Sequence, residues 1–155
     1  VGPVYMRFGR LAVPVINDET TYKFEIGKGV ELRPGKDITI IATGLPVSES
    51  LEAAKLLAED GIDAQVINIH TIKPLDEKLV VKAAQATGRV FTVEEHSIIG
   101  GLGSAVMECL AEKNPVKVTR IGVRDIFGES GPAKDLLHKY ELDAEGIYKQ
   151  IKAAL

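Results

Sequence analysis

The sequence has 155 residues, of which 45% are hydrophobic, 26% charged and 5% aromatic, so a disordered or fibrous chain is excluded. The net charge is −3 and the basic residues are scattered singly, which excludes the basic stripe that nucleic-acid binding requires. No apolar run reaches the roughly 18 to 20 residues of a membrane span, so we expect neither a nucleic-acid nor a membrane partner. The single Cys109 cannot form an internal disulfide, which favours a reducing, cytoplasmic compartment.

The first residues of the chain alternate in a strand-like manner and begin with Val1, not Met. We interpret this start as the cut end of a longer protein and expect a strand over residues 1–8. Residues 9–30 hold scattered Pro, Gly, Asn and Asp with short β-prone stretches such as residues 21–24. This composition predicts a linker or meander with little helical periodicity.

From residue 33 onward, short apolar runs alternate with amphipathic helical patterns. The predicted strands cover residues 38–42, 64–69, 90–93 and 116–121. The predicted helices run from about Ser48 to Gly61, over 74–87, closed by Gly88, over 101–113, and near 133–139 and 144–154. The buried face of the first helix is expected to hold Leu51, Ala54, Leu57 and Ala58. The pattern predicts a three-layer α/β/α open sheet, mostly parallel with one possible antiparallel edge strand.

Glycines open the third predicted helix, at the strand edge where such sheets bind ligands. Gly100, Gly101 and Gly103 could expose backbone N–H groups to a phosphate. The dinucleotide fingerprint fails, however, because its third glycine would stand at position 106, which is Val. We therefore favour close backbone packing, against a neighbouring domain or subunit, by these glycines. A free-standing nucleotide- or metabolite-binding regulatory module that uses this turn stays open as an alternative function.

Glu94, Glu95 and His96 form the densest group of titratable residues in the sequence. A histidine beside carboxylates can serve in proton transfer. Adjacent residues on an extended strand point in opposite directions, so at most two of the three side chains converge. We interpret the group as a polar network that structures the loop or an interface.

The remaining candidates are isolated residues. His70 has no second histidine at metal-ligand spacing and is interpreted as a loop residue. Ser130 lacks one flanking glycine of a nucleophile elbow and is expected to cap a helix. Cys109 should be a small buried hydrophobic residue. Arg7 and Arg10 could hold a phosphate between them. The sequence therefore predicts no self-sufficient catalytic set and no metal site.

Four segments carry a family resemblance: residues 4–10 (VYMRFGR), 34–44 (PGKDITIIATG), 93–106 (VEEHSIIGGLGSAV) and 127–131 (FGESG). In this order they resemble the carboxyl-terminal domain of transketolase, preceded by the last strand of the pyrimidine-binding domain. The resemblance divides the chain into the end of the pyrimidine-binding domain (1–16), a linker (17–32) and the C-terminal domain (33–155).

The resemblance implies an enzyme of the pentose phosphate pathway that transfers a two-carbon ketol unit between sugar phosphates. It uses thiamine diphosphate and a divalent metal such as Mg²⁺, with active sites at the interface of a homodimer. The amino-terminal and pyrimidine domains hold the cofactor and metal, so this chain is implied to be structural and dimerising, to bind neither group and to be inactive alone, with those domains as its partners.

The resemblance also assigns roles to two arginines. Arg7 matches a family arginine that contacts the substrate phosphate, and Arg10 matches a corresponding arginine mainly in synthase relatives. The same domain occurs in deoxyxylulose-phosphate synthase and in the β subunit of 2-oxo-acid dehydrogenases, which remain alternatives. The segments 94–96 and 127–131 favour transketolase over both.

Overall fold

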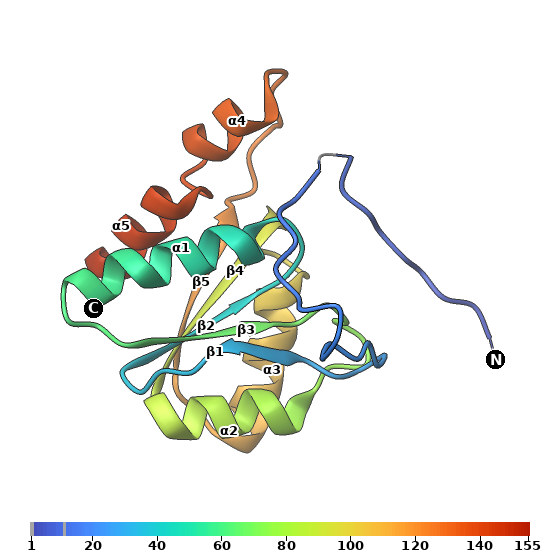
Figure 1. Ribbon diagram of the computed structural model, residues 1–155, viewed down its shortest axis with the longest axis vertical. Helices are drawn as coiled ribbons and strands as arrows, with labels where there is room; N and C mark the ends of the chain where they lie inside the picture. The colour runs from blue at the N-terminus through green and yellow to red at the C-terminus, as the bar shows by residue number, and fades with distance from the viewer. Residues whose placement is uncertain (1, 11) are drawn as a thin grey trace.

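The computed structural model describes residues 2–10 and 12–155 and is built around one five-stranded sheet (Figure 1). The strands are β1 (Val30–Arg33), β2 (Ile38–Ala42), β3 (Ala64–Asn68), β4 (Arg89–Ser97) and β5 (Lys117–Val123). Their order in the sheet is β1-β3-β2-β4-β5, with β1 antiparallel to β3 and the other pairings parallel. The predicted mostly parallel sheet with one antiparallel edge strand is confirmed.

The described residues form five helices, of which four cover the two faces of the sheet. The five helices are α1 (Pro46–Glu59), α2 (Glu77–Thr87), α3 (Leu102–Lys113), α4 (Ala133–Lys139) and α5 (Ala144–Ala154). Figure 1 shows α1 and α5 on one face and α2 and α3 on the other. In the part of the chain that the structure describes, no helix combines the length and apolarity needed to cross a membrane.

Each face of the sheet has its own hydrophobic core, as the central strand β2 illustrates. Ile38 and Ile40 pack in the core beneath α1 and α5, whereas Ile41 packs in the core beneath α2 and α3. This division follows from the period of two in a strand, which sends successive side chains to opposite faces. Every residue of β2 is buried, so the three-layer prediction is confirmed.

Three helices begin at residues other than the expected ones, and α3 does so by a single residue, at Leu102 instead of Gly101. Helix α1 starts at Pro46, before Ser48, because proline loses no hydrogen bond at the first helical position. Helix α2 starts at Glu77 and not at residue 74, because the Asp76 carboxylate accepts a hydrogen bond from the Leu79 N–H at 3.2 Å and caps the helix there.

The expected helix ends and buried faces are largely confirmed. Gly61 (φ +78°) follows the end of α1, and Gly88 (φ +68°) closes α2 in the left-handed conformation that glycine allows. One residue of the expected inner face of α1 is wrong, because Ala58 is exposed and Ala53 is buried instead.

The strands differ from the prediction mainly at their carboxyl ends. Strand β4 continues to Ser97, so residues 94–96 lie within it and not after it. Strand β5 runs to Val123, two residues further than expected. The position of the antiparallel edge strand was not predicted: this strand is β1, and residues 30–32, which we expected in the linker, belong to it. Only one edge of this short strand pairs, which leaves a weak pattern in the sequence.

The strand expected at the amino end is wrong for the described residues. Residues 2–8 form no strand and are no part of the sheet in Figure 1, and Val1 lies outside the described residues. Tyr5 is 89% exposed and Phe8 is 79% exposed. An alternating pattern becomes a strand only where another strand offers its hydrogen bonds, and β1 already pairs with the outer edge of β3.

Candidate functional site

The carboxyl edge of the sheet has a switch point between β2 and β4, which are parallel neighbours. The chain leaves β2 for α1 on one face and leaves β4 for α3 on the other (Figure 1). The two strand ends stay joined, since the N–H of Thr43 donates to the carbonyl of Val93 at 3.2 Å. Open α/β sheets bind ligands at such points, which makes this edge of the sheet the candidate site.

A buried carboxylate fills the amino end of α3. Glu94 is 1% exposed, and its two oxygens accept hydrogen bonds from the N–H groups of Leu102 and Gly103, each at 2.9 Å. Free N–H groups at a helix amino end attract anions, and here the chain's own carboxylate satisfies two of them. The phosphate-binding turn considered at residues 100–103 is therefore already occupied by Glu94.

The glycines of this turn allow that close approach. A Cβ atom at Gly101 would lie 1.9 Å from the Glu94 Oε2, and one at Gly103 would lie 2.8 Å from atoms of Thr92 and Arg120. Gly100 has open space around it but a φ of +75°, which strains other residues. Gly101 and Gly103 thus allow this loop to pack closely against its own domain, whereas Gly100 allows the backbone conformation of the turn. Whether they also face a neighbouring subunit stays a prediction.

Arg7 reaches back from the amino-terminal segment to the end of β4. Its Nη1 lies 3.2 Å from the Nδ1 of His96 and 3.5 Å from a carboxylate oxygen of Glu95. The two neighbouring β4 residues converge because the register between β4 and β5 shifts between Val93 and Ser97. Glu94 turns instead towards α3, so two of the three titratable side chains meet at Arg7.

Arg10 is exposed and makes no hydrogen bond or ion pair with residues 2–10 or 12–155. The structure therefore does not bring Arg7 and Arg10 together on a shared partner. Among the described residues there is also no group of three or more His, Cys, Asp or Glu side chains that could hold a metal ion.

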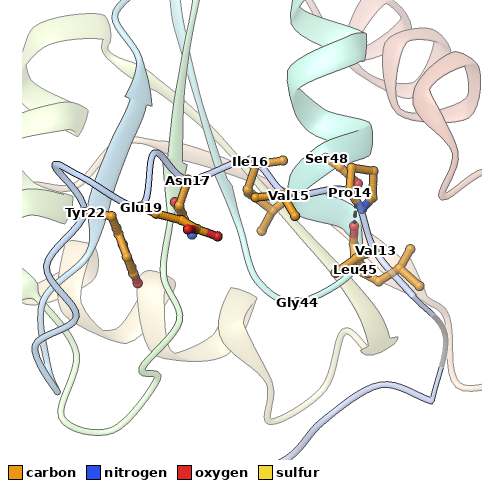
Figure 2. A pocket seen from close by; sticks show the side chains of 11 residues that line it. Val13, Pro14, Val15, Ile16, Asn17, Glu19, Tyr22, Gly44, Leu45 and Ser48 are labelled. Carbon is orange, nitrogen blue, oxygen red and sulfur yellow. Dashed lines mark hydrogen bonds between the residues drawn. The ribbon is translucent and has the colours of Figure 1, made fainter.

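An apolar groove of about 380 Å³ lies beside the switch point (Figure 2). One wall is the amino-terminal segment, from Val13 to Asn17 together with Glu19 and Tyr22, and the other is the loop and first turn of α1, with Leu45 and Ser48. The sequence did not indicate this groove, because β1 and β2 separate the residues of its two walls along the chain.

Three isolated candidates are placed as follows. Cys109 is buried, as predicted, and burial raises the pKa of its thiol, which disfavours the reactive thiolate. The Nδ1 of His70 lies 2.8 Å from the Thr71 hydroxyl, but its buried Nε2 has no partner among the described residues. Burial lowers the pKa of His70. The helix cap expected at Ser130 is wrong, since α4 begins after Pro132 without a side-chain cap.

The role of Glu94 was missed because its partners are eight and nine residues further along the chain. The signal was present, however. A carboxylate at the end of a strand, followed by two glycines before a helix, has the spacing for a side chain to cap that helix across the loop.

Comparison with known proteins fits this architecture. A family profile described as "Transketolase, C-terminal domain" matches residues 27–147. The 6-deoxy-6-sulfo-D-fructose transketolase subunit SqwH of Clostridium sp. (strain MSTE9) is 49% identical over 148 residues, which are 96% of this chain and 46% of that protein. The 1-deoxy-D-xylulose-5-phosphate synthase 1 of Geobacter sulfurreducens is 42% identical over 159 residues, with 99% of this chain and 25% of that protein covered.

A solved structure described as "Split gene transketolase, inactive beta4 tetramer" shares the fold with a TM-score of 0.94 and 48% identity. The match covers 99% of this chain and 50% of that one. The present chain spans about half the length of the transketolase subunits it matches. The profile covers most of the chain, so the chain belongs to the transketolase C-terminal domain family.

Proposed function

We propose that this chain is the carboxyl-terminal part of a transketolase that transfers a two-carbon ketol unit between sugars carrying a terminal oxyanion. The observation that carries the proposal is the family match over residues 27–147, together with the TM-score of 0.94 to a split-gene transketolase. The names of two relatives specify a sulfonated and a phosphorylated sugar, which supports an oxyanion as the shared substrate feature. The sugar phosphates of the pentose phosphate pathway fall in this class.

Within that enzyme, the chain acts as a structural and dimerising part and carries no catalytic residue. Mg²⁺ requires carboxylate or amide oxygen ligands. The diphosphate group of thiamine diphosphate requires free N–H donors, such as those at the amino end of a helix. The described residues contain no cluster of three or more His, Cys, Asp or Glu side chains that could hold a metal ion, and Glu94 occupies the amino end of α3. The residues present therefore do not fit these groups, and the amino-terminal and pyrimidine domains would bind them.

The amino-terminal residues 1–16 are proposed to complete the pyrimidine-binding domain, with residues 17–32 as the connection. In support, residues 2–8 are extended and leave Tyr5 and Phe8 exposed on this chain. Neighbouring large apolar side chains that are exposed on one chain often mark a surface that another domain or chain covers. Arg7 and Arg10, in the same segment, would then lie near the substrate and contact its oxyanion.

The proposed partners are the remaining domains of the enzyme and a second copy of the subunit. The relative named as a transketolase subunit and the related structure described as a split-gene tetramer support an assembly of separate chains. That related tetramer is described as inactive, which supports the expectation that this chain alone does not catalyse ketol transfer.

The test is an assay of the full-length subunit reconstituted with its partner subunit, thiamine diphosphate and Mg²⁺. We expect ketol transfer from xylulose 5-phosphate to an aldose phosphate, and no turnover by the 155-residue chain alone. Failure of the reconstituted enzyme to transfer a ketol unit from any phosphorylated or sulfonated ketose would contradict the proposal.

A second candidate is the same domain in deoxyxylulose-phosphate synthase, which the 42% identity to the Geobacter enzyme favours. When pyruvate is added to the same assay, such an enzyme would consume it, whereas a transketolase would not. The nucleotide-binding alternative has less support, because the turn that it would use already holds Glu94.

A further inference from the structure

Two side chains of β4, those of His96 and Glu95, contact Arg7. Among the described residues, these are the polar side-chain contacts that connect residues 2–10 to the sheet. The Arg7 side chain is 51% exposed, while that of Glu95 is 22% exposed. The arginine therefore has its inner side against the domain and its outer side open.

The two contacts use the same nitrogen of the guanidinium. Nη1 carries two hydrogens, one for the Nδ1 of His96 and one directed towards the Glu95 carboxylate. Because arginine has no acceptor atom, the His96 Nδ1 must be the acceptor of this hydrogen bond. The Nε and Nη2 groups remain, and together they form the flat edge that binds an oxyanion through two parallel hydrogen bonds.

We propose that His96 and Glu95 are positioning residues that orient Arg7 towards the terminal oxyanion of the sugar substrate. The inference rests on the proposed function and deepens it, because it gives a defined part in substrate binding to a domain that holds no catalytic residue. An arginine on an extended segment would otherwise lose its rotamer freedom at each binding event, which weakens affinity.

The two positioning residues differ in their electrostatic effect. His96 orients Arg7 through an uncharged acceptor atom and does not repel an oxyanion. Glu95 orients the same nitrogen but carries a negative charge that opposes the approach of phosphate or sulfonate. Replacing the two side chains should therefore change substrate binding in different directions, which a general loss of folding would not do.

The experiment uses the full-length subunit assembled with its partner, and two variants of one residue. His96→Phe removes the acceptor, whereas His96→Asn places an amide oxygen near the position of Nδ1. We expect His96→Phe to raise the KM for a phosphorylated ketose about 3- to 10-fold, the range for one immobilised long side chain, with kcat within about twofold. His96→Asn should restore the KM to near that of the unmodified enzyme.

Substrates and a third variant provide the controls. The KM of His96→Phe for the same ketose without its phosphate should be unchanged, and a sulfonated ketose should behave like the phosphorylated one if any terminal oxyanion is recognised. Glu95→Gln keeps an acceptor oxygen and removes the charge, so the KM for the phosphorylated ketose should fall, and a rise in this KM would overturn the inference.

Equal effects of His96→Phe on the two ketoses, or equal KM values for His96→Phe and His96→Asn, would overturn the inference and leave the proposed function standing. If Arg7→Ala has no selective effect on the phosphorylated ketose, the role of Arg7 and this inference both fail. If the assembled unmodified enzyme transfers no ketol unit, the proposed function itself is overturned.

Discussion

Two segments of this chain have similar strand-like apolar patterns but differ in burial. Strand β2 (Ile38–Ala42) lies between β3 and β4, and all five of its residues are buried. Residues 2–8 also carry large apolar side chains, among them Tyr5 and Phe8, but they pair with no strand and remain exposed. A hydrophobic pattern therefore indicates which side chains favour burial, but the neighbouring strands and helices determine whether they are buried within this chain.

The largest expected difference between these regions is in stability. Phe91 in β4 is fully buried, so Phe91→Ala should lower the free energy of unfolding by about 3 to 5 kcal/mol. Tyr5→Ala, in the exposed segment, should change it by less than about 0.5 kcal/mol. Denaturant unfolding of the two variants measures both values. Similar losses for both would mean that the amino-terminal segment is packed in solution.

The next effect concerns the junction between β4 and α3. Gly101→Ala would displace the Glu94 carboxylate and leave two N–H groups of α3 without their acceptor, at a cost of about 2 to 3 kcal/mol. Glu94→Ala should cost a similar amount. Because both changes break the same contact, the double variant should lose much less unfolding free energy than the sum of the two single variants. Additive losses in denaturant unfolding would contradict this explanation.

Gly100→Ala is the matched control for that comparison. A Cβ atom there would meet no neighbour within 4 Å, but the φ of +75° disfavours any L side chain. The expected loss is about 1 to 2 kcal/mol, from backbone strain alone. It should be the same in the presence or absence of the Glu94 side chain.

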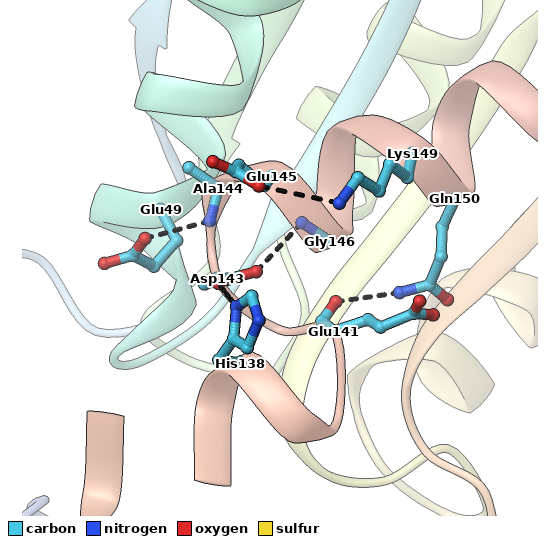
Figure 3. Close-up of polar contacts among 9 residues, drawn as sticks. All are labelled: Glu49, His138, Glu141, Asp143, Ala144, Glu145, Gly146, Lys149 and Gln150. Atoms are coloured by element: carbon cyan, nitrogen blue, oxygen red, sulfur yellow. Dashed lines mark hydrogen bonds and ion pairs between the residues drawn. The ribbon is translucent and has the colours of Figure 1, made fainter. Parts of the chain in front are cut away.

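A smaller effect is expected at the junction between α4 and α5 (Figure 3). Asp143 caps α5, since its carboxylate accepts a hydrogen bond from the Gly146 N–H at 2.9 Å. Asp143→Ala should therefore cost about 1 kcal/mol in denaturant unfolding. A loss near zero would indicate that the cap is not formed in solution.

The smallest effect is a dependence on pH at the same junction. The Nδ1 of His138 lies 2.6 Å from the Asp143 carboxylate, and this hydrogen bond raises the pKa of His138 above 6.5. Burial opposes ionisation of Asp143, but hydrogen bonds from His138 and the Gly146 N–H lower its pKa below 3.8 overall.

The sign of the dependence follows from these two directions. The contribution of His138 is fully present below pH 6.5 and is lost as the pH rises through its raised pKa in the folded protein. The contribution of Asp143 is present above pH 3.8 and is lost as the pH falls through its lowered pKa. His138→Gln should therefore destabilise the protein more at pH 5.5 than at pH 8.5. The thermal midpoints of both proteins at the two pH values measure this, and a larger loss at pH 8.5 would contradict it.

Most of the fold could be predicted from local patterns. The four parallel strands and five helices repeat apolar runs and helical periods within single stretches of chain, and Gly88 marks a helix end directly. Strand β1 could not be predicted in this way, because only Val30 and Leu32 of its four residues are apolar, a pattern too short to distinguish it from the linker.

The candidate site was less accessible from the sequence. Gly101 stands out in the sequence together with its neighbouring glycines, but its close approach to Glu94 depends on the orientation of that side chain, which the local pattern does not define. Arg7 and His96 are 89 residues apart, so neither residue alone indicates their contact. Such long-range polar contacts have no period in a sequence, and only the folded chain brings them together.

The proposed function requires that thiamine diphosphate and Mg²⁺ bind to domains other than this one. Isothermal titration of the folded 155-residue chain with thiamine diphosphate and Mg²⁺ measures this binding. We expect no saturable heat of binding at concentrations that saturate the assembled enzyme. Saturable, stoichiometric binding to the isolated chain would contradict this requirement.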